Sequence, residues 1–226
     1  MQSIIGLDGC ASGWAIASKN IKSDLIEFHL ISQLDQLNDM FKQPYLIAID
    51  MPVHLINLFR SVDQKARVIL GKRASTVFNA PSISALKENN FQTASLINFE
   101  LTGKKLSKQS FNLFKKIREV QNFKNSNPAI RIYESHPELA FMKLNENHVV
   151  LEKKKTAEGK IKRIKLLQSI FDSFDFENLR AKFNKNMIKN DDILDSFAML
   201  YVALKIYNRC EDCIMDDVFE NVSISF

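Results

Sequence analysis

An apolar helical pattern with two aspartates near its start runs through residues 190–204. Asp192 and Asp195 are three residues apart, so a helix places both carboxylates on one face. Most positions around and after Asp195 are apolar, which indicates a helix buried within the fold. Like charges repel, and burial strengthens the repulsion. We therefore expect these acids either to cap the helix in water or to have a cation beside them.

Two further aspartates end short apolar runs that are typical of buried strands. Asp8 follows Ile-Ile-Gly-Leu, and Asp50 follows Leu-Ile-Ala-Ile. Strand ends converge on a crevice in α/β sheets, where ligands bind. Each acid also has an ordinary explanation, because Asp8 precedes a glycine as turn residues do and Asp50 could cap the next segment. Taken with the helical pair, they predict a site for Mg²⁺ or Mn²⁺, since such cations prefer oxygen ligands.

A third strand-like run, at residues 130–134, leads into another set of polar residues. It ends at Glu134, and a helix is expected to start near His136 and to contain Glu138. Glu134 is a candidate metal ligand or water-orienting base, and His136 could protonate a leaving group or orient a water. Both glutamates also suit a structural role, because acids near a helix start are favoured by the helix dipole.

Carboxylates gathered in this way suit two-metal phosphoryl transfer. Two divalent ions about 3.5–4 Å apart clamp the attacking and leaving oxygens and activate a water. Zinc is disfavoured, because Cys210 and Cys213 form one pair with no second pair to complete a site. The predicted catalytic and metal-binding residues are Asp8, Asp50, Glu134, Asp192 and Asp195.

Length and composition fit a globular protein of the cytoplasm. The 226 residues are enough for one domain with a substantial core. Three cysteines form no disulfide framework, which favours a reducing compartment. No apolar stretch reaches the roughly 18 residues of a membrane span, so we expect no membrane association. The formal charge of +5 is compatible with a polyanionic partner.

Basic residues recur along the chain, most densely between residues 153 and 165. Such a run is often only a solvated helix face. As a nucleic-acid interface it predicts backbone-directed binding to DNA or RNA that weakens steeply with salt. The candidate nucleic-acid-binding residues are Arg73, Ser75, Lys108, Lys116, Arg118 and Lys155.

Hydrophobic periodicity predicts one α/β domain over residues 1–226, with a helical insertion at about 60–125. Three antiparallel strands are expected first, followed by buried strands alternating with helices. The strands are predicted at residues 3–8, 13–18, 25–31, 45–50 and 130–134, with an edge strand within 217–226. The helices are predicted at 32–43, 60–70, 82–90, 92–102, 108–120, 136–144, from 156 onward and at 191–209.

Short motifs follow one another along the chain, among them Gly6-Leu-Asp-Gly-Cys10, Ile49-Asp-Met-Pro52, Tyr133-Glu-Ser-His-Pro-Glu138 and Asp191-Asp-Ile-Leu-Asp-Ser196. The whole series, in its order, resembles the predicted nucleases filed as domain of unknown function 429, which are assigned to the ribonuclease-H-like superfamily. The resemblance implies a mixed sheet of three antiparallel and then parallel strands flanked by helices. It also implies metal-binding acids at Asp8, at Asp50 and at the Asp-x-x-Asp pair, with Glu134 in a Glu-x-His-Pro-Glu motif. Ser196 stands where the family more often has alanine, a change we expect to be harmless. The motifs lie at residues 6–10, 13–14, 49–52, 73–81, 106–109, 116–120, 133–138, 154–159 and 191–196.

The sequence therefore predicts a nuclease, with two alternatives. One is a nucleic-acid-binding or scaffold protein without catalysis, in which the acids serve stability. The other is a relative of the actin-like kinases and ATPases, whose nucleotide loops are rich in glycine. The chain has only six glycines, which argues against the second alternative.

Overall fold

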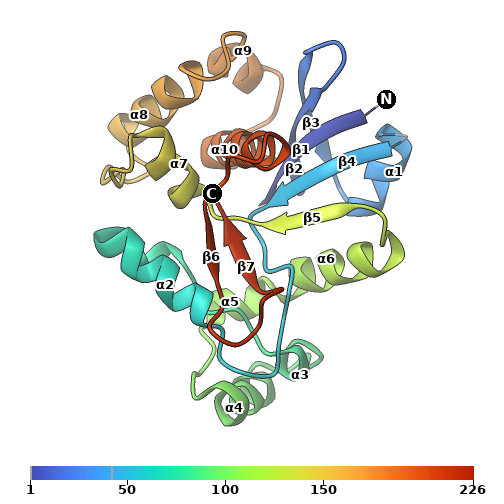
Figure 1. Cartoon of the computed structure of the whole chain (residues 1–226), viewed down its shortest axis with the longest axis vertical. Helices are drawn as coiled ribbons and strands as arrows, with labels where there is room; N and C mark the ends of the chain where they lie inside the picture. Colours follow the sequence, from blue (N-terminus) through green and yellow to red (C-terminus); the bar gives the residue numbers. More distant parts are fainter. Residues whose placement is uncertain (1, 42) are drawn as a thin grey trace.

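A mixed five-stranded sheet in the order β3-β2-β1-β4-β5 forms the centre of the fold (Figure 1). The computed structural model describes residues 2–41 and 43–226. The first three strands pair antiparallel, and the last two run parallel to β1, which confirms the predicted fold class. The strands are β1 (Gln2–Cys10), β2 (Gly13–Asn20), β3 (Ile26–Ile31), β4 (Gln43–Ile49) and β5 (Arg131–Glu134).

Helices cover both faces of this sheet (Figure 1). One face packs against α10 (Asn190–Tyr207), and α7 (Pro137–Leu144) and α8 (Ala157–Gln168) pack against α10 in turn. The other face packs against α6 (Phe114–Ser126) and the short segment of η1 and α1. The remaining helices are η1 (Leu34–Gln36), α1 (Leu37–Met40), α2 (Ser61–Leu70), η2 (Gly71–Thr76), α3 (Ile83–Leu86), α4 (Phe91–Thr102), α5 (Lys108–Asn112) and α9 (Phe176–Ala181).

Gly6 lets α10 lie directly on the backbone of β1. A Cβ atom at Gly6 would fall 2.0 Å from the backbone nitrogen of Leu200 and 2.4 Å from the carbonyl oxygen of Ser196. Side chains alternate along a strand, so Asp8 points to the same face as Gly6. Ile5 and Leu7, in contrast, join the core on the α6 side. The close approach at Gly6 thus brings the start of α10 over Asp8.

Several predicted elements differ in extent. The helix expected at 32–43 is reduced to η1 and α1, because Phe41 is already extended and β4 begins at residue 43. The helix expected at 108–120 is divided into α5 and α6 around Leu113, and α6 continues to Ser126. Helix α9 was not predicted from the sequence.

The C-terminal strand is also different from the prediction. Only β7 (Ser223–Ser225) forms within 217–226, and it pairs with β6 (Cys213–Met215) in a separate two-stranded sheet rather than along an edge of the main one. A single bridge from Ser225 to Ser135 links this small sheet to the end of β5. Ile214 and Ile224 pack with Val62 of α2 in a third apolar cluster. Elements α2 to α6 occupy the long connection between β4 and β5, where the insertion was predicted.

The part of the chain that the structure describes contains no helix that is long and apolar enough to cross a membrane.

Candidate functional site

Three aspartates from three elements meet where β1 and β4 end beneath α10. Asp8 lies near the end of β1, and Asp50 directly follows β4. The two strands are parallel neighbours, and the Asp50 amide donates a 3.2 Å hydrogen bond to the carbonyl of Leu7. Asp195, in the second turn of α10, is only 2% exposed. The structure thus brings together Asp8, Asp50 and Asp195, as the sequence predicted for an acid cluster.

Burial and mutual repulsion perturb all three carboxyl groups. Burial raises the pKa of Asp8 well above its usual range, and repulsion from Asp195 and Asp50 raises it further. Burial also raises the pKa of Asp50, although nearby His136 and Lys154 oppose the shift. The pKa of Asp195 rises to about 7 because burial outweighs its attraction to Lys154. The cluster therefore holds negative charge that the fold only partly compensates.

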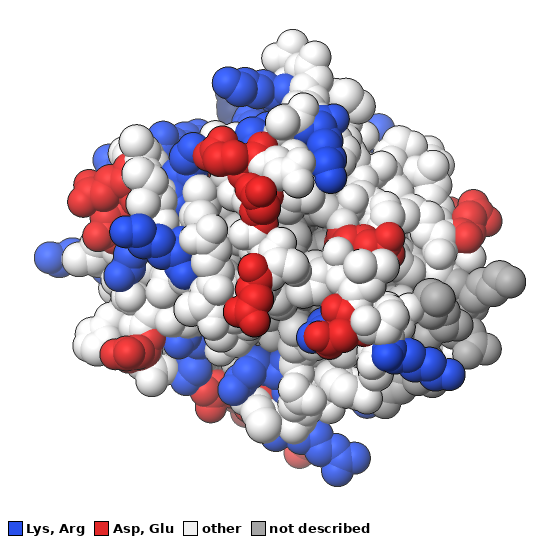
Figure 2. Space-filling model, turned by 90° about the horizontal axis from the view of Figure 1, so that it is seen from above, with Lys and Arg blue, Asp and Glu red and all other residues white. Residues whose placement is uncertain are grey.

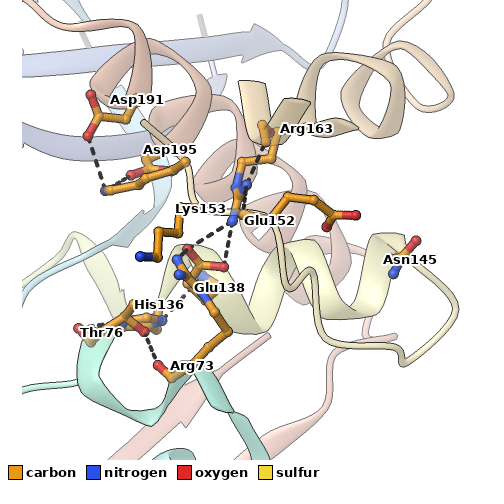
Figure 3. A network of polar contacts seen from close by, with 12 residues as sticks. Arg73, Thr76, His136, Glu138, Asn145, Glu152, Lys153, Arg163, Asp191 and Asp195 are labelled. Atoms are coloured by element: carbon orange, nitrogen blue, oxygen red, sulfur yellow. Dashed lines mark hydrogen bonds and ion pairs between the residues drawn. The ribbon is translucent and has the colours of Figure 1, made fainter. Parts of the chain in front are cut away.

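Lys154 is the cation within this cluster. Its Nζ lies 2.8 Å from Oδ2 of Asp195 and 3.5 Å from Oδ2 of Asp191, and Figure 3 shows both carboxylates pointing to the same ammonium group. Asp195 is the main cause that raises the pKa of Lys154, so the lysine stays protonated. Gly159 fixes the segment before α8, since a Cβ there would fall 2.1 Å from the Lys153 carbonyl oxygen. From the sequence, Lys154 belongs to the basic run and to the motif at residues 154–159, but its contact with Asp195 was not predicted.

Asp8 and Asp50 differ from the other candidate acids of the site because no hydrogen-bond donor among the described residues contacts their carboxylates. Among the described residues, no hydrogen bond contributes to the pKa shift of either carboxylate; burial and charges alone account for it. Asp8 is only 6% exposed. A buried carboxylate normally accepts hydrogen bonds or pairs with a cation. These two therefore keep oxygens available for a ligand.

Glu134 does not join the cluster. In the parallel register Glu134 pairs with Ile49, so it points to the α6 side of the sheet, away from Asp8. Its Oε1 accepts a 2.5 Å hydrogen bond from Arg60, and its Oε2 accepts a 2.9 Å bond from the amide of Val53. The structure thus gives Glu134 an internal ion pair instead of a place beside Asp8.

Glu138 is also neutralised within the fold. Arg163 donates to both of its oxygens at 2.8 and 3.0 Å, and Arg73 donates at 2.7 Å from the opposite side (Figure 3). The ring of His136 accepts the Glu138 amide at Nδ1, while Nε2 lies 3.3 Å from the Thr76 carbonyl oxygen. His136 caps α7 and lies close enough to lower the pKa of Asp50.

Asp192 has the capping role that the sequence left open. Its Oδ2 accepts a 2.9 Å hydrogen bond from the backbone amide of Lys189, before the first turn of α10. Burial raises its pKa, and its charge adds a small upward contribution to the pKa of Asp8. Asp192 therefore lies at the margin of the cluster, and Asp195 lies at its centre.

Three of the six candidate nucleic-acid-binding residues have other partners. Arg118 donates to the carbonyls of Leu86 and Glu88 and holds the end of α3. Lys116 donates to the Gly13 carbonyl and lies 4.4 Å from the ring centroid of Trp14. Arg73 is paired as described above. Those that remain exposed are Ser75, Lys108 and Lys155. On the face shown in Figure 2, basic and acidic side chains are interspersed, so that face offers no continuous basic track.

A basic cavity of about 610 Å³ lies beside the acid cluster and shares Lys154 and Asp191 with it. It opens between the start of α8 and the start of α10. The residues that line it are Lys154, Lys155, Thr156, Ala157, Lys160, Lys185, Lys189, Asn190 and Asp191.

A family model described as "Protein of unknown function (DUF429)" matches residues 6–219. The chain belongs to this family. The matched residues include Asp8, Asp50 and Asp195 as well as the lysines of the cavity. Neither a search of curated proteins nor a search of solved structures gave a match. Across residues 2–41 and 43–226, no three His, Cys, Asp or Glu side chains stand close enough to form a metal-binding group.

Proposed function

We propose that this protein hydrolyses nucleic-acid phosphodiester bonds with the help of Mg²⁺ or Mn²⁺ at Asp8, Asp50 and Asp195. One observation carries the proposal: the fold neutralises Glu134 and Glu138 with arginines but leaves Asp8 and Asp50 without a hydrogen-bond donor. Removing a charge from water costs several kcal/mol unless it is compensated. Carboxyl groups perturbed in this way gather at functional sites.

The residues present suit a divalent cation. Their donors are carboxylate oxygens, which Mg²⁺ and Mn²⁺ prefer. The ammonium of Lys154 already stands as a cation among the carboxylates, 2.8 Å from Asp195. Once a bound cation keeps all three carboxylates ionised, they and the one ammonium carry two negative charges, the charge that one divalent ion balances. A cage of three protein ligands is not required, since Mg²⁺ is often held by one or two carboxylates together with waters and substrate phosphates.

Each residue of the cluster has a role that follows from its position. A bound ion would supply polarisation of the phosphodiester and activation of a water. Asp8 and Asp50 would hold that ion with their free oxygens. Asp195, with its pKa raised to about 7, can accept a proton near neutral pH. Lys154 holds Asp195 in place and faces the charge that develops on the phosphate. A second ion would require Lys154 to leave Asp195.

A cleavage assay tests this proposal. Labelled single-stranded and duplex DNA and RNA are incubated with the wild type in Mn²⁺ or EDTA. We expect Mn²⁺-dependent cleavage of at least one of them, and a loss of more than about 100-fold in Asp8→Asn, because a ligand is removed. Asp172→Asn changes an exposed acid outside the site and is expected to keep the wild-type rate. Absence of cleavage of all four substrates by the wild type would refute the proposal.

A scaffold or nucleic-acid-binding protein without catalysis is the second candidate. The Lys154–Asp195 ion pair favours it, because this pair already compensates part of the cluster without a metal. In that case Mn²⁺ would neither raise the melting temperature of the wild type nor support cleavage. Stabilisation by Mn²⁺ that depends on Asp8 would exclude this candidate.

A further inference from the structure

The lysine-lined cavity between α8 and α10 has more positive charge than its surroundings neutralise. Five lysines and one aspartate line it, and that aspartate, Asp191, is already paired with Lys154. Lys160 has a 3.4 Å contact with the exposed Glu177. Lys155 and Lys185 are exposed and form no ion pair with the described part of the chain. The positive charge of this lining would therefore attract an anion.

Two helices also begin at this cavity. Thr156 caps α8 by accepting the Gly159 amide at 3.1 Å, and Thr156 and Ala157 line the cavity. Asn190 and Asp191, in the first turn of α10, line it from the other side. The first amides of a helix have no acceptor within the helix, and the helix dipole adds positive potential there. The starts of two helices and the lysines beside them therefore surround the cavity, an arrangement that suits a phosphate group.

The cavity is continuous with the acid cluster through two shared residues. Lys154 and Asp191 line the cavity, and the Nζ of Lys154 also contacts Asp195. A strand whose scissile phosphate lies at Asp8 and Asp195 would therefore pass next to these lysines. The volume of about 610 Å³ lies within the range of cavities that hold small organic ligands, so it has room for a nucleotide-sized group.

We propose that this cavity is a phosphate-binding subsite that holds a backbone phosphate of a single nucleic-acid strand beside the acid cluster. The inference rests on the proposed function, because the strand must continue to the carboxylates. Under this proposal, residues at the starts of α8 and α10 bind the backbone phosphate. Arg73, Lys116 and Arg118, which have internal partners, are then not required for binding.

Binding measured without cleavage tests the subsite. The anisotropy of a short labelled single-stranded oligonucleotide is followed in EDTA at several salt concentrations. The double variant Lys155→Gln/Lys185→Gln is compared with Lys162→Gln/Lys165→Gln, which removes the same charge from α8 outside the cavity lining. We expect the cavity variant to weaken binding roughly tenfold or more, and its slope of log K against log salt to fall by about 1.4, for two lost phosphate contacts. The control is expected to keep its slope, and both variants to keep the wild-type melting temperature.

Equal effects of the two double variants would overturn the proposal, since only net charge would then matter. A second arm measures melting temperature with inorganic pyrophosphate. If the wild type is stabilised by pyrophosphate but does not bind the oligonucleotide, the assignment to nucleic acid is wrong and the ligand is a free phosphate compound. Cleavage in Mn²⁺ is scored separately. Oligonucleotide binding that depends on the cavity, in a wild type that cleaves nothing, would support the subsite and refute hydrolysis.

Discussion

The buried acids of this protein fall into two groups according to their partners. Glu134 and Glu138 are held by arginines at 2.5–2.8 Å. The first pair joins the end of β5 to the start of α2, and the second set joins α7 to α8 and η2. Within the described part of the chain, Asp8 and Asp50 have no such donor. A buried charge that has lost its partner costs about 3–5 kcal/mol, so acids kept only for stability would be expected to have partners. The partners thus separate the acids held by arginines from those with free oxygens, a distinction that spacing in the sequence does not make.

Asp195 gives the site a pH dependence with a definite sign. Its folded pKa of about 7 lies above its unfolded value of about 4, so the folded state binds the proton more tightly. Its contribution to stability is therefore present at low pH and is lost as the pH rises from about 4 to about 7. We expect Asp195→Asn to remove this loss and to be more stable than wild type at pH 8 in EDTA, by at most about 4 kcal/mol.

Urea unfolding at pH 5 and pH 8 measures this difference, with Asp172→Asn as the control. If Asp195→Asn shows the same loss of stability as wild type between the two pH values, the raised pKa is wrong.

Lys154 is expected to compete with a metal ion for the same carboxylates. In Lys154→Met the apo protein should melt at a lower temperature, because Asp195 loses its ion pair. The rise in melting temperature on adding Mn²⁺ should be larger than in wild type, because the cation must now supply all of the compensation. Lys153→Met, at the neighbouring exposed lysine, is the matched control. A smaller Mn²⁺ effect in Lys154→Met than in wild type would show that the lysine helps the metal to bind.

At the scale of elements, the contact between β1 and α10 builds the site. Gly6 permits this contact, because it leaves room for the backbone of α10 at Ser196. The hydroxyl of Ser196 donates a 2.8 Å hydrogen bond to the carbonyl of Ile193. The Ser196 hydroxyl is therefore satisfied within the helix, although it is buried. A second contact joins the segment before α8 to α10. In it, Gly159 packs against the Lys153 carbonyl and Lys154 pairs with Asp195.

Gly6→Ala is expected to destabilise the protein by at least about 2 kcal/mol, because its Cβ would overlap backbone atoms of α10 that cannot move separately. Gly103→Ala is the control: Gly103 has a φ of +68° but no atom within 4 Å of an added Cβ. It should cost only the backbone strain of about 1 kcal/mol. Equilibrium urea unfolding of both variants measures the difference, and equal losses would mean that the α10 contact can adjust.

At the scale of the whole molecule, local patterns predicted the strands in their order along the chain. They did not predict which charged side chains form ion pairs. Apolar runs ending in Asp8 and Asp50 were enough to place those acids at neighbouring strand ends. The register of β5 against β4 decides on which face of the sheet Glu134 lies. Spacing in the sequence does not determine that register. The pairing of Lys154 with Asp195 joins residues 41 positions apart through the packing of α8 on α10. Short elements such as β6 and α9 lack a periodic pattern long enough to predict.

The central claim is that Asp8, Asp50 and Asp195 come together to bind a divalent cation. Crystals soaked in Mn²⁺ and measured by anomalous scattering test it most directly, with Asp8→Asn crystals as the control. The account predicts an anomalous peak in contact with Asp8 and Asp50 in the wild type and its loss in the variant. No peak at these carboxylates, with Lys154 still on Asp195, would contradict it.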